Sequence, residues 1–134
     1  MNNARRNNDE DEKDEKDEVK KQYYFYSLKC KDETITPCYH GSTTNLNKRF
    51  SDHKYNVQVP SNQKYNYTKS TFIRNNGGMN NWYACVNYTE VCTKYKSRLI
   101  ERAFIETDKN ATLNMILPIA FDNEKKNRKK TQII

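Results

Sequence analysis

Apolar and polar residues are arranged along this chain in two patterns. Three short stretches mix aromatic and aliphatic residues with polar ones, which is typical of strands. These predicted strands cover 22–30, 37–42 and 82–88. Three other stretches place apolar residues three or four positions apart, as on one face of a helix. These predicted helices cover 44–54, 65–76 and 92–108.

The last of these helices has the clearest pattern. Five apolar residues fall on one face of it, namely Tyr95, Leu99, Ile100, Ala103 and Phe104. Glu101 lies beside this face, next to large apolar neighbours. A carboxylate in that setting is either a residue at the boundary of the buried face or a ligand, and the helical pattern alone favours the boundary.

Charge and aromatic content divide the chain into three parts. The 134 residues include 24 Lys and Arg against 17 Asp and Glu, which gives a net charge of +7. Residues 1–21 hold 6 basic and 8 acidic residues and few apolar ones, so we expect a disordered polyampholyte. Residues 22–121 contain all ten tyrosines and all five phenylalanines, and we expect them to fold as one domain. Residues 122–134 form a basic tail.

The basic body of the chain predicts a polyanionic partner. Nucleic acid is the first candidate, because each phosphate that is neutralised releases counterions. No apolar run approaches the roughly 20 residues of a membrane span. The polar N-terminus also lacks the apolar segment of a secretory signal. We therefore expect an intracellular protein of the cytoplasm or nucleus, not secreted and with no membrane partner.

The four cysteines, Cys30, Cys38, Cys85 and Cys92, are expected to be free thiols. Disulfides belong mainly to secreted proteins, and these spacings lack the tight Cys-x-x-Cys pairs of zinc ribbons. A small structural zinc protein that uses some of these cysteines remains a less favoured alternative.

The first predicted helix carries basic groups at helical spacing. Arg49 and His53 are one turn apart and Lys48 is adjacent, so the three could bind a phosphate. The alternative is an ordinary solvated helix face. Tyr26 and Tyr39, on adjacent predicted strands, either bring their hydroxyls toward that helix or belong to the core.

The order of these features along the chain is distinctive. In sequence they are Tyr24-Phe25-Tyr26, Tyr39-His40-Gly41-Ser42, the helix that begins at Thr44 and includes Arg49 and His53, Glu101 in the last helix, and Leu113-Asn114. This order resembles the GIY-YIG nuclease family, which includes phage homing endonucleases and the N-terminal domain of the UvrC repair excinuclease. The resemblance covers roughly Tyr23 to Pro118.

The resemblance implies an α+β fold, a small three-stranded antiparallel sheet flanked by helices. It also implies a set of site residues at the matching positions. The catalytic residues would be Tyr26, Tyr39, Arg49, His53 and Glu101, with Glu101 as the metal ligand and with Gly41 and Asn114 in support. Nucleic acid would be contacted by Lys48, Arg49 and Lys54.

The chain departs from the family pattern in two places. Tyr24 and Phe25 replace the glycine and isoleucine of the first motif, and His40 replaces the isoleucine of the second. His40 either faces solvent or joins the site. Gly41 is kept, and we expect it to permit a close backbone turn into the helix.

The resemblance further implies a metal-dependent endonuclease that hydrolyses DNA phosphodiester bonds. Glu101 would hold Mg²⁺, for which Mn²⁺ can substitute, and no small-molecule cofactor is expected. Arg49 would stabilise charge on the phosphate in the transition state. Tyr26 is the favoured general base, with Tyr39 and His53 as alternatives. A non-catalytic nucleic-acid-binding module of the same fold is the alternative function.

Overall fold

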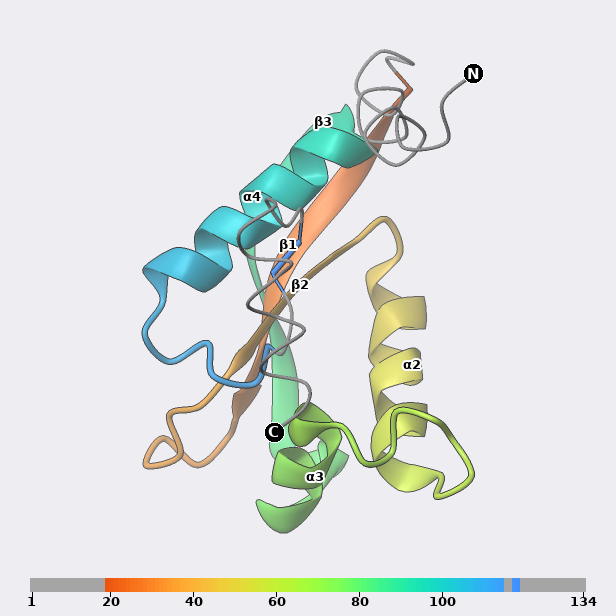
Figure 1. Cartoon of the computed structure of the whole chain (residues 1–134), viewed down its shortest axis with the longest axis vertical. Helices are drawn as coiled ribbons and strands as arrows, with labels where there is room; N and C mark the ends of the chain where they lie inside the picture. Colours follow the sequence, from red (N-terminus) through yellow and green to blue (C-terminus); the bar gives the residue numbers. More distant parts are fainter. Residues whose placement is uncertain (1–18, 115–116, 119–134) are drawn as a thin grey trace, which may run out of the picture.

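A computed structural model describes residues 19–114 and 117–118 of the chain (Figure 1). Its elements are β1 (Lys20–Cys30), β2 (Tyr39–Thr43), α2 (Leu46–Gln58), α3 (Thr68–Asn75), the short 3-10 helix η1 (Met79–Asn81), β3 (Trp82–Thr93) and α4 (Lys94–Thr107). Most of the predicted N-terminal segment 1–21 and all of the basic tail 122–134 lie outside the described residues. Within the described part, no helix combines the length and the apolar character needed to cross a bilayer.

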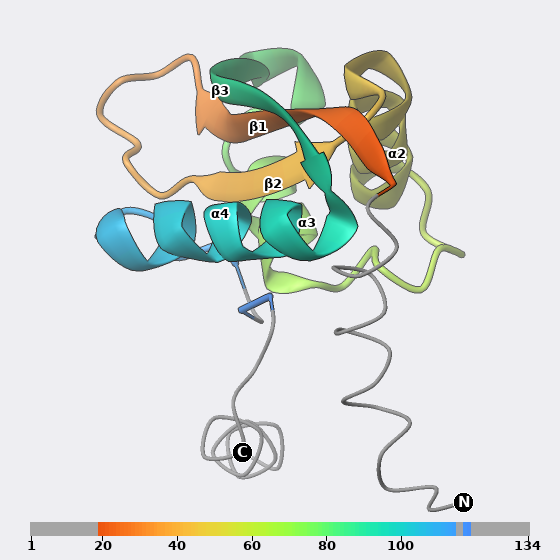
Figure 2. The ribbon, with the colours of Figure 1, turned by 90° about the horizontal axis from the view of Figure 1, so that it is seen from above.

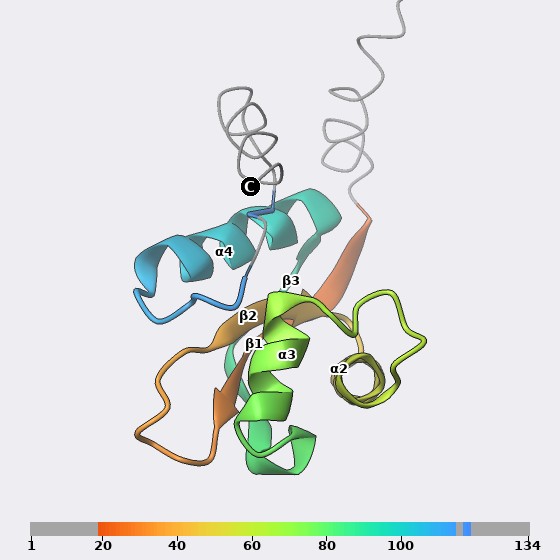
Figure 3. The same ribbon diagram turned by 60° about the horizontal axis from the view of Figure 1, so that its bottom comes forward.

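The strands form one antiparallel sheet in the order β2-β1-β3, so β1 is central and β2 is an edge strand. Figure 3 shows α4 on one side of this sheet and α2 and α3 on the other. Seen from above, α4 runs alongside β2 (Figure 2). The prediction of an α+β fold with a three-stranded antiparallel sheet is therefore confirmed.

Two strands are longer than their sequence pattern indicates. β1 begins at Lys20, and β3 continues to Thr93, five residues past the predicted end. The added residues of β3, 89–93, pair with residues 20–24 of β1, from Thr89 opposite Tyr24 to Thr93 opposite Lys20. Most of them are exposed, so no buried face marks them in the sequence. Backbone pairing rather than burial defines this part of the sheet.

Side-chain caps define where two helices begin. Asn45 accepts a hydrogen bond from the backbone N–H of Lys48 at 3.1 Å, which caps α2. Thr93 accepts one from Lys96 in the same way, so β3 passes into α4 without a loop. The end of α2 was predicted too early, because Val57 is buried in the core and the helix continues past it.

A β-bulge interrupts the pairing of β1 with β3. Phe25 lies opposite Tyr88, whereas the next residue, Tyr26, lies opposite Val86. Asn87 is therefore the extra residue of β3. Bulges redirect side chains, and the Asn87 amide donates a hydrogen bond of 2.6 Å to the hydroxyl of Ser27 on β1.

The two faces of the sheet differ in content. The face toward α2 and α3 carries the main apolar core, which includes Tyr26, Leu28, Val57, Ile73 and Trp82. On the face toward α4, the ring of Phe104 stacks against Phe25 and His40, with centroid distances of 6.1 and 5.9 Å. Because successive strand residues alternate between faces, neighbouring residues of β2 point to opposite sides of the sheet, one toward the core with α2 and α3 and the next toward α4.

Gly41 has a role other than the expected turn. It lies inside β2, and it is not among the described glycines with positive φ. The ring of Tyr26 packs directly over it: a Cβ at Gly41 would lie 2.5 Å from the Tyr26 hydroxyl oxygen and 2.6 Å from Cζ. Glycine is required here because the strand backbone and this ring approach so closely.

The Gly41→Ala substitution is therefore expected to destabilise the fold by about 1–3 kcal/mol through overpacking. The free energy of unfolding in urea would measure this cost. In a Tyr26→Leu background the same substitution should cost much less, because the ring atoms that the new methyl group meets are gone. An equal cost in both backgrounds would show that Tyr26 is not the cause.

Candidate active site

Tyr26 occupies the centre of the sheet face that α2 covers. Only 1% of its surface is exposed, and its hydroxyl lies 2.6 Å from Nε2 of His53. Burial raises the pKa of Tyr26, and the negative charge of Glu101 adds to the rise, while Arg49 opposes it. The phenol is thus neutral at rest, with its oxygen held against an imidazole.

His53 connects Tyr26 to a second partner. It lies on α2, one turn after Arg49, and its other nitrogen, Nδ1, is 2.6 Å from Nζ of Lys69. Burial lowers the pKa of His53 to about 2, and the positive charges of Lys69, Arg49 and Lys64 contribute. His53 is therefore a neutral imidazole that bridges a phenol and an amine.

Lys69 is a site residue that the sequence analysis missed. It comes from the first turn of α3 and is 7% exposed. Burial lowers its pKa to about 8, helped by Lys64 and Arg49. Its sequence signal is a lysine four residues before the buried Ile73, on the apolar face of a short helix. When the apolar face of the helix packs on the core, such a lysine is buried with it, and its amino group then needs a polar partner.

Tyr39 joins this group from β2. Its ring centroid lies 6.5 Å from that of Tyr26 and 5.3 Å from that of His53, and Nζ of Lys69 lies 5.0 Å from it. Burial raises the pKa of Tyr39, and Glu101 adds to the rise. The two tyrosines predicted from the sequence therefore do converge at α2.

A pocket of about 200 Å³ opens next to these rings. Its lining includes Tyr39, Arg49, Asp52, His53, Asn62, Lys64 and Lys69. Cationic groups outnumber the single carboxylate in this lining, so the pocket favours an anion. The Nε of Arg49 is buried and has no hydrogen-bond partner among the described residues, so part of this guanidinium is uncommitted.

Glu101 approaches β2 from the α4 side of the sheet, opposite the tyrosines. It lies on α4, and its Oε1 accepts a hydrogen bond of 2.6 Å from the hydroxyl of Ser42. Burial raises the pKa of Glu101, while Ser42 and Arg49 oppose the rise. A half-buried carboxylate with reduced solvation suits a cation, and its oxygen donors are of the kind that Mg²⁺ prefers. The residues present thus fit a hard divalent ion.

Asn114 braces β2 through its backbone. The Asn114 amide donates to the carbonyl of His40 at 2.8 Å and accepts from the N–H of His40 at 2.9 Å. These two bonds satisfy both backbone groups of an edge-strand residue that has no strand partner on that side. The expected supporting position of Asn114 therefore has a clear structural basis.

Lys48, Lys54 and His40 also lie outside the pocket lining. Lys48 and Lys54 are on the exposed face of α2, outside the pocket lining. His40 neither faces solvent nor joins the tyrosines. It is 5% exposed and lies on the α4 face of the sheet, where its Nε2 is 2.8 Å from Asp108. The alternative in which His40 faces solvent is therefore wrong, and strand alternation turns its ring away from Tyr39 toward the α4 face, where its charge also acts on Glu101.

Comparison with known proteins adds the family. The model of the GIY-YIG catalytic domain matches residues 22–114, which run from β1 to Asn114 and include every site residue described above. No curated protein and no solved structure matches the chain. Because the family model covers more than half of the sequence and its motif residues meet around β2, the chain belongs to the GIY-YIG family.

Proposed function

We propose that this protein is a metal-dependent endonuclease that hydrolyses phosphodiester bonds in DNA. The observation that carries the proposal is the meeting of Tyr26, Arg49 and Glu101 around β2. The charges of Arg49 and Glu101 both act on the pKa of Tyr26, and Arg49 also opposes the rise in the pKa of Glu101. A neutral phenol, a cation and a half-buried carboxylate are the components that phosphodiester hydrolysis needs for proton transfer, phosphate binding and metal binding.

The cationic pocket would receive the scissile phosphate. Arg49 can offer paired N–H donors to two phosphate oxygens, and Lys64 adds positive charge at the pocket wall. The same guanidinium stabilises negative charge as it accumulates in the transition state. Exposed Lys48 and Lys54, elsewhere on α2, are suited to contacts with the flanking backbone phosphates.

Glu101 would hold Mg²⁺, or Mn²⁺ in its place, together with substrate oxygens and water. When bound, such an ion neutralises charge on the phosphate and polarises its oxygens. Ser42 orients the carboxylate by its hydrogen bond to Oε1, which sets the direction in which Glu101 presents its oxygens.

The contacts from Tyr26 through His53 to Lys69 suggest the path of the proton. If Lys69 is an uncharged amine, it accepts a hydrogen bond from Nδ1–H of His53. Nε2 then accepts one from the Tyr26 hydroxyl. As water gives a proton to the Tyr26 oxygen, the phenol proton passes to His53, and the Nδ1 proton passes to Lys69.

This transfer leaves hydroxide character on the attacking water. Its oxygen forms a bond to phosphorus while the bond to the leaving nucleoside oxygen breaks, and Lys69 ends as an ammonium group. Tyr26 therefore acts as the base toward water in this scheme, His53 relays the proton, and Lys69 is its final acceptor. Because burial and the nearby Arg49 hold the pKa of His53 well below its usual range, His53 does not retain the proton.

A charged Lys69 blocks the same path. An ammonium group only donates, so Nδ1 of His53 must accept and Nε2–H must point at Tyr26. Tyr26 then has no acceptor for its own proton. The charged and uncharged forms of Lys69 thus correspond to inactive and active tautomers of His53.

The Glu101→Gln variant is expected to reduce plasmid cleavage by at least about a hundredfold. Its amide oxygen can still accept from Ser42, so the fold should persist, but the charge that holds the cation is gone. Nicking of supercoiled plasmid with Mg²⁺ measures the effect, and EDTA should silence the wild type. Glu106→Gln is the matched control, since Glu106 lies on α4 but is paired with Arg102.

Cleavage by Glu101→Gln at the wild-type rate would overturn the assignment of the metal ligand. DNA binding by the wild type without any cleavage would instead support the non-catalytic module. Binding measured by fluorescence anisotropy on the same preparations separates these outcomes.

The cleavage rate of the wild type is expected to rise with pH, roughly tenfold per unit, and to level off near pH 8. The sign follows from Lys69: below its pKa of about 8 it is charged and cannot accept a proton. Arginine stays protonated at every accessible pH. Lys69→Arg should therefore be slow, and its pH profile should lack this rise.

Single-turnover rates between pH 6 and 9.5 would test this expectation, with circular dichroism to verify the fold. The charged or titratable groups that face Lys69 are His53 and Arg49 of α2, Tyr39 of β2 and Lys64 of the preceding loop. A Lys69→Arg enzyme with the wild-type profile would exclude Lys69 as the proton acceptor.

A further inference from the structure

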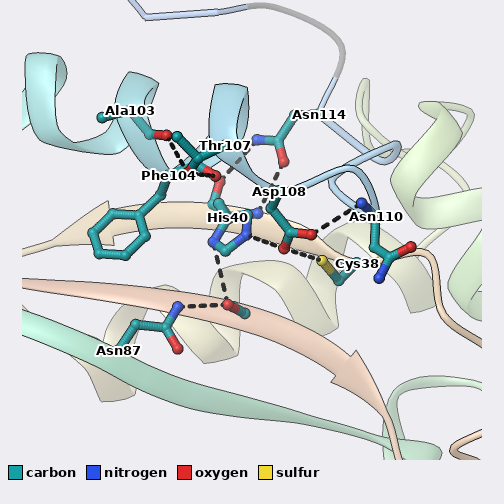
Figure 4. A network of polar contacts seen from close by, with 10 residues as sticks. Cys38, His40, Asn87, Ala103, Phe104, Thr107, Asp108, Asn110 and Asn114 are labelled. Atoms are coloured by element: carbon teal, nitrogen blue, oxygen red, sulfur yellow. Dashed lines mark hydrogen bonds and ion pairs between the residues drawn. The ribbon is translucent and has the colours of Figure 1, made fainter.

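A second cluster of metal-ligating side chains lies on the α4 face of the sheet, apart from the tyrosines. It contains Cys38, just before β2, His40 on β2 and Asp108, which ends α4 (Figure 4). One potential ligand atom from each residue lies within 4.8 Å of the other two. Glu101 is not a member of this cluster, so it is separate from the proposed catalytic ion.

The three side chains point at one another. His40 Nε2 is 2.8 Å from Asp108 Oδ2, and the thiol of Cys38 lies 3.4 Å from the same oxygen. Cys38 and His40 are buried, with 3% and 5% of their surfaces exposed. All three donors therefore face a common point between β2 and the end of α4.

A second layer of hydrogen bonds orients two of these groups. Nδ1 of His40 lies 3.2 Å from the hydroxyl of Ser27, which in turn accepts from Asn87, the extra residue of the β-bulge. The other oxygen of Asp108, Oδ1, accepts from the backbone N–H of Asn110 at 2.9 Å. Outer partners of this kind orient the ligands in metal sites, and Figure 4 shows them around His40 and Asp108.

The cluster is also accessible to an ion from solvent. Cys38 and Asp108 line a pocket of about 320 Å³, in which Lys29 and Glu33 contribute one positive and one negative charge. The pocket leaves room for a water molecule as a fourth ligand. A site with three protein ligands and one open position is a common zinc arrangement.

We propose that Cys38, His40 and Asp108 bind a zinc ion. Thiolate, imidazole and carboxylate together are a zinc donor set, whereas Mg²⁺ avoids sulfur and nitrogen ligands. On binding, Cys38 releases its proton to solvent. The His40 proton moves from Nε2 to Nδ1, where it is donated to the Ser27 hydroxyl, so Nε2 is free for the metal.

The surroundings of Cys38 affect the form of its thiol. Burial raises the pKa of Cys38 to about 12, and the nearby Asp108 carboxylate adds to the rise. A bound cation favours the thiolate, which is the form that binds metals. Of the four free cysteines, only Cys38 belongs to a group of three potential metal ligands within the described part of the chain.

A zinc ion here would tie β2 to the segment after α4. That segment already contacts the strand through backbone hydrogen bonds, from Cys38 to Asn110 and from Leu113 to Cys38. It also carries Asn114, which braces His40. The ion would therefore stabilise the edge strand that bears Tyr39 without taking part in proton transfer.

Cobalt and zinc binding to the full chain would test the proposal. After chelator treatment and removal of the chelator, the wild type should bind one equivalent of Co²⁺ with a thiolate-to-cobalt charge-transfer band, and Zn²⁺ should abolish the band. Cys38→Ser should lose this band, and Asp108→Asn should bind Zn²⁺ at least about tenfold more weakly. Cys85→Ser is the matched control, because Cys85 is half-buried on β3 outside the cluster.

The variant Glu101→Gln should bind Zn²⁺ and show the cobalt band like the wild type, whatever its effect on cleavage. Zinc should also raise the melting temperature of the wild type but not that of Cys38→Ser. A wild-type protein without the charge-transfer band would overturn the zinc site, and so would a Cys38→Ser protein that keeps it. The three residues would then form only a hydrogen-bonded tie.

Discussion

The wedging of Tyr26 between a strand backbone and a histidine is the interaction on which the rest of the site depends. Its ring fills the space that a side chain at Gly41 would need, and its hydroxyl meets His53. One side chain of the central strand thus joins an edge strand and a helix. A buried polar group must be fully satisfied, so the positions of α2 and, through Lys69, of α3 follow from this contact.

The edge strand β2 separates two kinds of chemistry by alternation alone. Tyr39 lines the cationic pocket and Gly41 lies against the ring of Tyr26 on the same face, whereas His40 and Ser42 face α4. Glu101, held by Ser42, offers only oxygen, and the cluster around His40 offers sulfur and nitrogen as well. A hard cation would therefore bind at Glu101 and a borderline cation at the cluster around His40, although both sites border the five-residue strand β2.

The sequence predicted most of the fold because burial leaves a periodic pattern. Tyr26, Tyr39 and Arg49 were placed correctly at one helix, since each lies on a regular element. Lys69 was missed because a lysine in a short, weakly patterned helix looks solvated until its helix docks. The sequence left the surroundings of His40 open, because its partner Asp108 is 68 residues away, a separation that no local pattern reports.

The bulge at Asn87 changes the phase of β3. Before it, Trp82 and Ala84 pack on the α2 side, and after it Tyr88 contacts Phe25 on the other side, although all three positions are even-numbered. Loss of one residue before the bulge would reverse the faces of everything upstream of it or remove the bulge itself. We therefore expect β3 to tolerate substitutions far better than insertions or deletions. Insertions and deletions are tolerated in loops such as 59–67.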